Sequence, residues 1–159
     1  METESIENEL KANYLFKFAN YVRWPSSAFP SLNSALSLCI VGEDPFGAAL
    51  DNAVGDQRID SRSVVVRRLK QIGRESGCHI LYVGISDSQR ARQTLDTIRG
   101  TNVLTVTDAH GPETGIINFV VKDNRLRFNI DDDAADQNGL VLSSKLLSLA
   151  VNVKLRQAR

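Results

Sequence analysis

The sequence contains little that would assign it to a special structural class. Its 159 residues include only two cysteines, one methionine, one tryptophan and four prolines. Lysine and arginine together number 19, as do aspartate and glutamate, so the formal net charge is zero. A neutral chain lacks the positive field that holds nucleic acid or an acidic membrane surface. We therefore expect no nucleic-acid binding. No apolar run approaches the roughly 18 residues of a membrane-spanning helix, so we also expect no direct membrane insertion.

The remaining composition is that of one ordinary globular domain. Apolar residues make up 42% of the chain. A chain of this length can bury roughly 70% of the surface that its unfolded form exposes, so the core needs neither a metal nor disulfides. The sequence contains no internal repeat and no linker-like stretch, and we interpret residues 1–159 as a single domain.

The first residues leave the cellular compartment open. Residues 1–5 are acidic and lack the basic segment and apolar segment of an export signal. Taken literally, this start indicates a cytosolic protein. A mature protein whose export signal had been removed would begin in the same way, inside an amphipathic helix.

The two cysteines allow two interpretations. Cys39 and Cys78 have no CxxC spacing and no further cysteine partners, which does not favour a structural zinc site. Each lies in an apolar, strand-like run, at residues 36–41 and 78–83. They are either two buried free thiols or one disulfide closing a loop of about 40 residues, worth roughly 4 kcal/mol in the chain-entropy model.

Hydrophobic periodicity predicts a helix at each end of the chain. Ile6, Leu10, Tyr14 and Phe18 repeat every four residues, which predicts an amphipathic helix over about 5–23. The apolar spacing near the C-terminus predicts a last helix over about 143–155. Between them we expect four short strands separated by helices or turns, at residues 36–41, 63–67, 78–83 and 103–106, with helices from Asp44-Pro45 to 54 and from 86 to 98.

An antiparallel hairpin is predicted after these strands. Residues 116–121 and 125–130 are apolar or alternating runs joined by a turn at 122–124. Strands that alternate with helices, followed by a hairpin, imply a three-layer α/β fold. We expect a mostly parallel sheet, of order about 2-1-3-4, extended by the hairpin and covered by helices on both faces.

Polar residues at the carboxyl ends of the predicted strands form a candidate ligand site. Glu43 and Asp44 follow the first strand and Gly84 ends the third, and ligands of such sheets bind at this end. Residues 41–47 match neither a dinucleotide-binding glycine motif nor a phosphate-binding loop. The sequence therefore predicts at most a small-molecule pocket here, without a nucleotide cofactor.

The two histidines lie in different surroundings. His79 follows Cys78 in a strand, so their side chains point to opposite faces and cannot share a metal ion. We interpret His79 as a packed or hydrogen-bonded residue of the sheet. His110 lies near Glu113 in a polar loop, and both are candidates for contact with a ligand or partner because loops often carry function.

Two charged clusters have structural explanations. Asp131, Asp132 and Asp133 could bind a cation, but negative charge at a helix N-terminus is favourable by itself, so we expect a capping role. Residues 67–74 carry four basic side chains that form either a solvated edge or a contact for an acidic partner. No nucleophile has a recognisable base and orienting partner, so we predict no catalytic residue, metal or cofactor, and no enzyme.

Several segments together resemble the YfiR/HmsC-type family of small exported bacterial proteins. The pattern begins with YLFKFANYVRWP at 14–25 and ends with SSKLLSLA at 143–150. Between these lie LCIVG at 38–42, GCHILYV at 77–83, VLTV at 103–106, INF at 117–119 and RFNI at 127–130. The resemblance therefore extends over nearly the whole chain.

The resemblance implies a periplasmic protein whose export signal is absent from this sequence. Such a protein would repress a membrane-anchored diguanylate cyclase by contacting its periplasmic sensor domain, and so lower cyclic di-GMP and biofilm formation. The resemblance also implies a redox-sensitive role for cysteines and allows homodimers. Cys39 and Cys78 occupy positions that resemble a family disulfide pair. The alternative function is a non-catalytic small-molecule binding module with its pocket near Glu43, Asp44 and Gly84.

Overall fold

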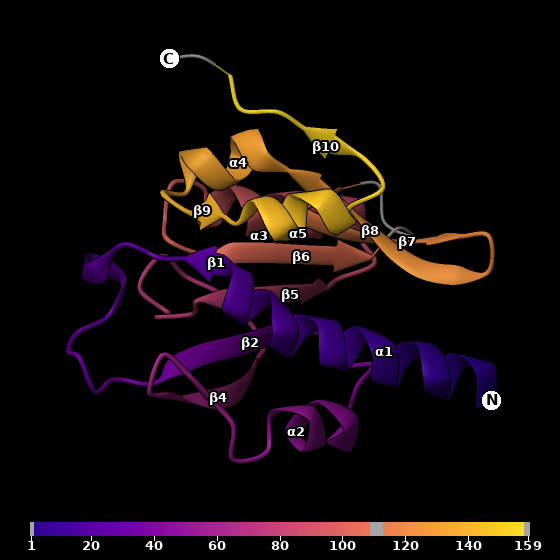
Figure 1. Ribbon diagram of the computed structural model, residues 1–159, viewed down its shortest axis with the longest axis horizontal. Coiled ribbons are helices and arrows are strands. Elements are labelled where there is room, and N and C mark those ends of the chain that lie inside the picture. The colour runs from indigo at the N-terminus through magenta and orange to yellow at the C-terminus, as the bar shows by residue number, and fades with distance from the viewer. Residues whose placement is uncertain (1, 109–112, 158–159) are drawn as a thin grey trace.

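The protein has a mixed α/β fold built on one large sheet (Figure 1). The computed structural model describes residues 2–108 and 113–157, with side chains from residue 6 onward. The large sheet has eight strands and is mostly parallel, and a separate antiparallel sheet has two. The helices are α1 (Glu2–Phe18), α2 (Ala48–Val54), α3 (Ser88–Thr97), α4 (Asp132–Gln137) and α5 (Ser144–Leu149), with short 3-10 turns at Ala19–Tyr21 and Ser26–Ala28.

The order of strands in the large sheet is β10-β8-β7-β6-β5-β2-β4-β3. Its strands are β2 (Leu36–Gly42), β3 (Arg58–Ile59), β4 (Arg62–Leu69), β5 (Ile80–Gly84), β6 (Leu104–Asp108), β7 (Ile117–Lys122), β8 (Arg125–Asp131) and β10 (Val153–Lys154). Strands β4, β2, β5 and β6 are parallel neighbours, so the first parallel strand of the chain lies between the second and the third. β7 joins β6 in parallel and forms the predicted antiparallel hairpin with β8.

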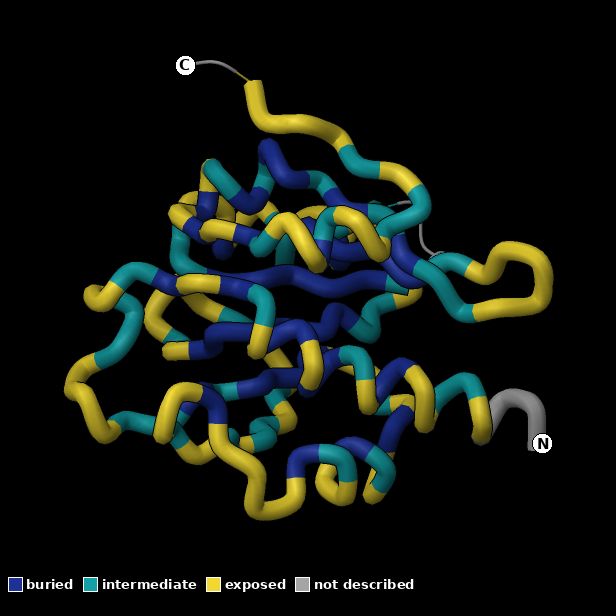
Figure 2. The backbone as a smooth tube through the Cα atoms, in the orientation of Figure 1, coloured by how far each residue is buried: buried dark blue, intermediate teal, exposed yellow. Residues whose placement is uncertain are grey.

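Strand β2 divides its side chains between two cores. Leu38 and Ile40 belong to the larger core, which also holds buried side chains of α1, α2 and α5. Cys39 and Val41 point the other way into a smaller core with Ala91 of α3. A continuous apolar run is therefore needed here, because both faces of the strand are covered. Figure 2 shows the central strands buried and the outer turns exposed.

Four aromatic rings anchor α1 to the far half of the sheet. Phe18 stacks against Phe119 of β7 at 6.0 Å between ring centroids and meets Phe128 of β8 edge-on at 5.3 Å. Tyr14, one turn earlier, contacts all three of these rings. The four-residue spacing thus places Tyr14 and Phe18 in one cluster, which confirms this half of the predicted apolar stripe. Its first half, Ile6 and Leu10, is exposed instead.

Both terminal helices are shorter than predicted. α1 ends at Phe18 rather than near residue 23, and the chain continues through a 3-10 turn into β1 (Val22–Arg23), which pairs with β9 (Val141–Leu142). The last helix, predicted to reach residue 155, ends at Leu149. Beyond it the chain adds β10 to the edge of β8, where Val151 N–H donates to the Phe128 carbonyl. In both places hydrogen bonds to a distant strand replace those of a continued helix.

The helix predicted from Asp44-Pro45 begins later, at Ala48. The Asp44 carboxylate accepts the N–H groups of Phe46 (2.8 Å) and Gly47 (3.2 Å). This side-chain-capped turn satisfies the backbone before the helix starts. Asp44 therefore has the local capping role that the sequence suggested, but in a turn that precedes α2.

Replacing Phe18 by alanine should lower the free energy of unfolding by about 3–5 kcal/mol, because it removes a fully buried ring from the aromatic cluster. Chemical denaturation measures this directly. Ile6→Ala is the matched control, since Ile6 lies on the same predicted stripe but is 58% exposed. A Phe18→Ala cost no larger than that of Ile6→Ala would contradict the assignment of Phe18 to the core.

Candidate functional site

A depression of about 240 Å³ lies at the carboxyl ends of β2, β5 and β6. Its wall includes Glu43, Gly84, Asp108 and Glu113. Glu43 is held there because its N–H donates to the Gly84 carbonyl at 2.8 Å. A Cβ on residue 84 would approach the Glu43 carbonyl oxygen to 2.0 Å, so glycine is required for these two chain segments to meet.

A buried lysine borders this end of the sheet. Lys11 of α1 is only 4% exposed, and its ammonium group forms ion pairs with Glu7, at 3.1 Å, and with Asp108 at the end of β6. A buried ammonium needs such partners because an unpaired charge is costly to desolvate. The sequence pattern did not single out Lys11. One signal was present, because Lys11 precedes Leu15 and Phe18 by four and seven residues and so lies on the inward face of the helix.

Tyr82 lies between this pocket and the larger core. Burial raises the pKa of its hydroxyl well above the ordinary value, and the negative charge of Asp108 raises it further. Its ring meets Phe46 edge-on at 4.8 Å. Tyr82 therefore stays neutral and serves as a polar-tipped wall of the pocket.

The pocket brings together only part of the predicted site. Glu43 and Glu113 both line it, and Glu113 also pairs with Arg92 of α3 at 2.9 Å. Asp44 is not in its lining and binds Arg68 of β4 at 2.6 Å instead. His110 lies outside the described residues. Of the two loop residues predicted to contact a ligand or partner, the structure therefore describes only Glu113.

Asp44 is an ionised structural group. Burial opposes its ionisation, but hydrogen bonds from the Arg68 guanidinium and from the Phe46 and Gly47 N–H groups outweigh burial and lower its pKa. Arg68 also reaches Asp51 of α2 at 3.0 Å. This arrangement fastens α2 to β4, which gives Asp44 and Arg68 a role without any ligand.

Two of the three carboxylates that line the pocket are engaged in ion pairs. Asp108 is bound by Lys11, and Glu113 by Arg92. Within residues 2–108 and 113–157, no group of three or more histidine, cysteine, aspartate or glutamate side chains could hold a metal ion. The described pocket is a small depression whose lining is more apolar than polar.

Cys39 and Cys78 form a disulfide with their Cα atoms 5.9 Å apart. Cys39 lies within β2, whereas Cys78 precedes β5 and lies outside the β2–β5 ladder, which begins with Leu38 opposite Ile80. The chain turns at Gly77, whose φ is +76°. Both cysteines are buried in the smaller core, so the bridge ties the start of β5 to the middle of β2.

His79 joins the sheet to the loop that follows β1. Its Nδ1 accepts the Ser37 N–H at 3.0 Å, and its Nε2 contacts the Ala28 carbonyl at 2.9 Å. These partners require the neutral ring with its proton on Nε2. The ring stacks on Phe29 at 4.3 Å. The predicted packing and hydrogen bonding of His79 are confirmed, but the residue directly precedes β5 and does not lie in the strand.

A wider depression of about 650 Å³ lies at the opposite, amino end of the strands. Its wall includes Arg23, Trp24, Phe29, Leu32 and Arg62. The Arg62 guanidinium lies 3.7 Å above the Phe29 ring and donates to two carbonyls of the loop. The sequence gives no sign of this depression, because its wall combines segments that are far apart in the chain.

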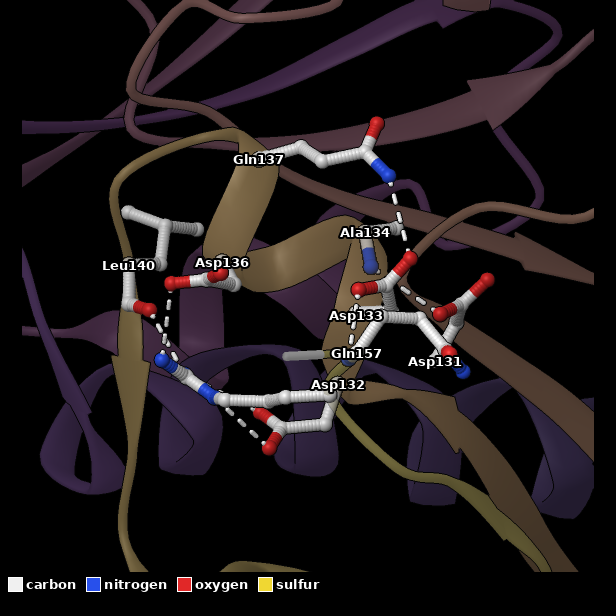
Figure 3. A network of polar contacts seen from close by, with 9 residues as sticks. Asp131, Asp132, Asp133, Ala134, Asp136, Gln137, Leu140 and Gln157 are labelled. Carbon is white, nitrogen blue, oxygen red and sulfur yellow. Dashed lines mark hydrogen bonds and ion pairs between the residues drawn. The ribbon is translucent and has the colours of Figure 1, made fainter. Parts of the chain in front are cut away.

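The three consecutive aspartates have structural partners (Figure 3). Asp131 caps α4 by accepting the Ala134 N–H at 3.0 Å, as predicted. Asp132 binds the Arg156 guanidinium at 2.9 Å, and Asp133 accepts the backbone N–H of Gln157 at the same distance. The aspartates thus also hold the C-terminal segment against α4, a role that the sequence pattern did not reveal.

The profile of the YfiR/HmsC-like family matches residues 8–151. The chain belongs to this family. The YfiR/HmsC-like family regulates cyclic di-GMP signalling, is periplasmic, and is regulatory rather than catalytic. The match includes both cysteines and every strand of the large sheet except β10. Among the residues that the structure describes, no helix of this family member is long and apolar enough to span a membrane.

Removing the disulfide should destabilise the protein by about 4 kcal/mol, because the bridge closes a loop across 39 positions of sequence. For the double variant Cys39→Ala/Cys78→Ala we expect a melting temperature lower by roughly 10 °C, measured by calorimetry. The oxidised and reduced wild-type proteins provide the control, since reduction should reproduce most of the loss. Two titratable free thiols in the oxidised, folded protein would refute the bridge.

Stability should fall in acid partly because of His79. Burial lowers the pKa of its ring below the ordinary 6.5, and the nearby Arg62 charge adds to this, against the opposing hydrogen bond to Ala28. As the pH falls below 6.5, the unfolded chain takes up a proton that the folded protein resists, so the free energy of unfolding decreases. Denaturant titrations between about pH 7 and pH 5 measure the slope.

Glutamine substitutions distinguish the contributions of the two histidines to this pH dependence. His79→Gln should flatten the slope in this pH range, since the titrating group is gone, whereas His110→Gln serves as the control for the other histidine. An unchanged slope in His79→Gln would show that other groups cause the acid sensitivity.

Proposed function

We propose that the protein is a periplasmic regulator that represses a membrane-bound diguanylate cyclase by binding the periplasmic sensor domain of that enzyme. The observation that carries this proposal is the family match over residues 8–151. Repression would lower cyclic di-GMP and therefore biofilm formation. A regulator of this kind acts only through its higher affinity for the inactive conformation of the cyclase.

Two features of the chain support a binding role outside the reducing cytosol. The Cys39–Cys78 disulfide fits an oxidising compartment, where such bridges persist. Two of the three carboxylates that line the carboxyl-end depression, Asp108 and Glu113, form ion pairs with Lys11 and Arg92 rather than acting as the base of a nucleophile. Both observations favour a protein whose surface, rather than a reacting group, carries its function.

The proposed contact surface includes the loop around His110 and Glu113. Glu113 lies at the wall of the depression, and its partner Arg92 has an exposed side chain at 66%. A surface ion pair with one exposed partner contributes little to stability, so its charges can be re-paired with a partner at small cost. We also propose that the protein can form homodimers, which ultracentrifugation would detect.

A second candidate function is a small-molecule binding module. The observation that favours it is the position of the 240 Å³ depression at the carboxyl ends of β2 and β5. The chain order of strands reverses between these two neighbours, and this is the point where ligands bind in open α/β sheets. In that case Glu43 and Glu113 would contact the ligand, and the cyclase would play no part.

Deletion of the gene should raise cyclic di-GMP and surface attachment, and the purified protein should bind the sensor domain of a co-encoded cyclase in calorimetry. Glu113→Lys should weaken binding several-fold, because it reverses a charge in the proposed contact. Glu75→Lys, an exposed charge reversal in the turn between β4 and β5, is the matched control. Unchanged cyclic di-GMP, together with no binding to the sensor domain, would leave the small-molecule module as the better interpretation.

A further inference from the structure

The two edges of the large sheet are covered to different extents. At one edge β10 pairs with β8, and Arg156 and Gln157 fasten the following segment to Asp132 and Asp133. At the other edge β3 pairs only with Arg62 and Ser63 of β4. Within the described part of the chain, no strand lies beside the outer edge of β4 from Val64 to Leu69. This edge is long, since β4 with its eight residues is the longest strand of the sheet.

The register shows which backbone groups of β4 are unpaired. Ile59 and Arg62 flank the two-residue turn between β3 and β4, so the backbone groups of Arg62 point outward to β3. Because these groups alternate along a strand, those of Val64, Val66 and Arg68 also point outward. No backbone hydrogen bond to these three residues occurs in the described structure beyond the ladders of β4 with β2 and β3. They form a row of free donors and acceptors, the feature to which an added strand binds.

The side chains of β4 leave one side of this edge open. Arg68 is drawn to the α2 face by Asp44, Asp51 and the Gly47 carbonyl. On the opposite face Val65 is 43% exposed, although it lies in the middle of an apolar strand. Arg67, on the same face, donates to the Ser76 carbonyl at 2.6 Å. An exposed valine beside a cationic side chain therefore accompanies the free backbone edge.

We propose that the outer edge of β4 is a docking site for an extended acidic segment of a partner protein, which binds by strand addition. The added strand would pair with the backbone of Val64, Val66 and Arg68, set an apolar side chain beside Val65, and set a carboxylate beside Arg67. Main-chain pairing supplies the affinity in such complexes, and the side-chain positions supply the specificity.

Charge selects an acidic segment over a second copy of this chain. Residues 58–70, which form β3, its turn, β4 and the next residue, contain five lysine or arginine residues and one aspartate. Two copies paired edge to edge would bring the same cationic side chains to both sides of the new ladder, where like charges are destabilising. A strand bearing carboxylates meets the opposite charge. Because this edge does not depend on a cyclase, the site can exist whether or not the proposed function is correct.

Hydrogen exchange in the full-length protein tests the free edge. In the protein alone, the amides of Val64, Val66 and Arg68 should exchange quickly, while those of Val65 and Arg67, which point to β2, should be protected. The probe is a ten-residue peptide in which every second residue is threonine and the others alternate valine with glutamate. Binding of this peptide should slow exchange at the three outward amides.

Fluorescence anisotropy with labelled peptides tests the chemistry. Replacing glutamate by lysine in the peptide should weaken binding about tenfold or more, since like charges then face each other. Replacing the central threonines by proline should have a similar effect, because proline removes backbone donors. In the protein, Val65→Glu should weaken binding of the acidic peptide about tenfold. Val121→Glu, at another exposed valine, in the β7–β8 hairpin, should not.

Three results would overturn the proposal. Slow exchange of the outward amides in the dilute protein alone would mean that the edge is already covered. Equal binding of the acidic and lysine peptides, or binding without protection of those amides, would place the contact elsewhere. Protection that appears without peptide as the protein concentration rises, together with a dimer in ultracentrifugation, would assign the edge to a second copy of the chain.

Discussion

Burial of β2 and β5 on both faces of the sheet is the constraint on which the other elements depend. All but the last residue of β5 are buried, and β2 sends alternate side chains into two separate cores. Each such side chain contributes roughly 1.5–3 kcal/mol when removed from water. Because water must be excluded from both faces, α1 and α2 cover one face and α3 covers the other. The polar groups that carry chemistry are thereby confined to the strand ends and the sheet edges.

The same constraint explains why the molecule differs from one end of its strands to the other. At the carboxyl ends, Lys11 and Asp108 neutralise each other beside a small depression. At the amino ends, His79 and Arg62 hold a long loop by hydrogen bonds and ring stacking. The contacts at the carboxyl ends are ion pairs, whereas the contacts at the amino ends include the neutral ring of His79. Acid should therefore act first on the amino end of the sheet, where a buried base must remain unprotonated.

Local patterns predicted much of this fold. The apolar run of β2 and the alternation of β8 are properties of neighbouring residues, and the positive φ values of Asp123 and Asn124 fit the tight turn expected between β7 and β8. Long-range pairing could not be read in the same way. The apolar spacing after residue 143 continued to favour a helix, because nothing near Val151 indicates that Phe128 will accept its N–H. The partner of Lys11 lies 97 residues away, so the candidate site could be located by its strand ends but not by its ion pairs.

The disulfide makes a covalent ring of the segment that contains α2, β3 and β4. When the chain is pulled from its two ends, the force passes through the sulfur atoms and does not extend the residues inside the ring. With the bridge spanning 39 positions, roughly 130–140 Å of contour length stays hidden at about 3.3–3.6 Å per residue. Tension applied at the two chain ends therefore cannot extend β4, so it does not by itself pull apart a contact that a partner makes with that strand.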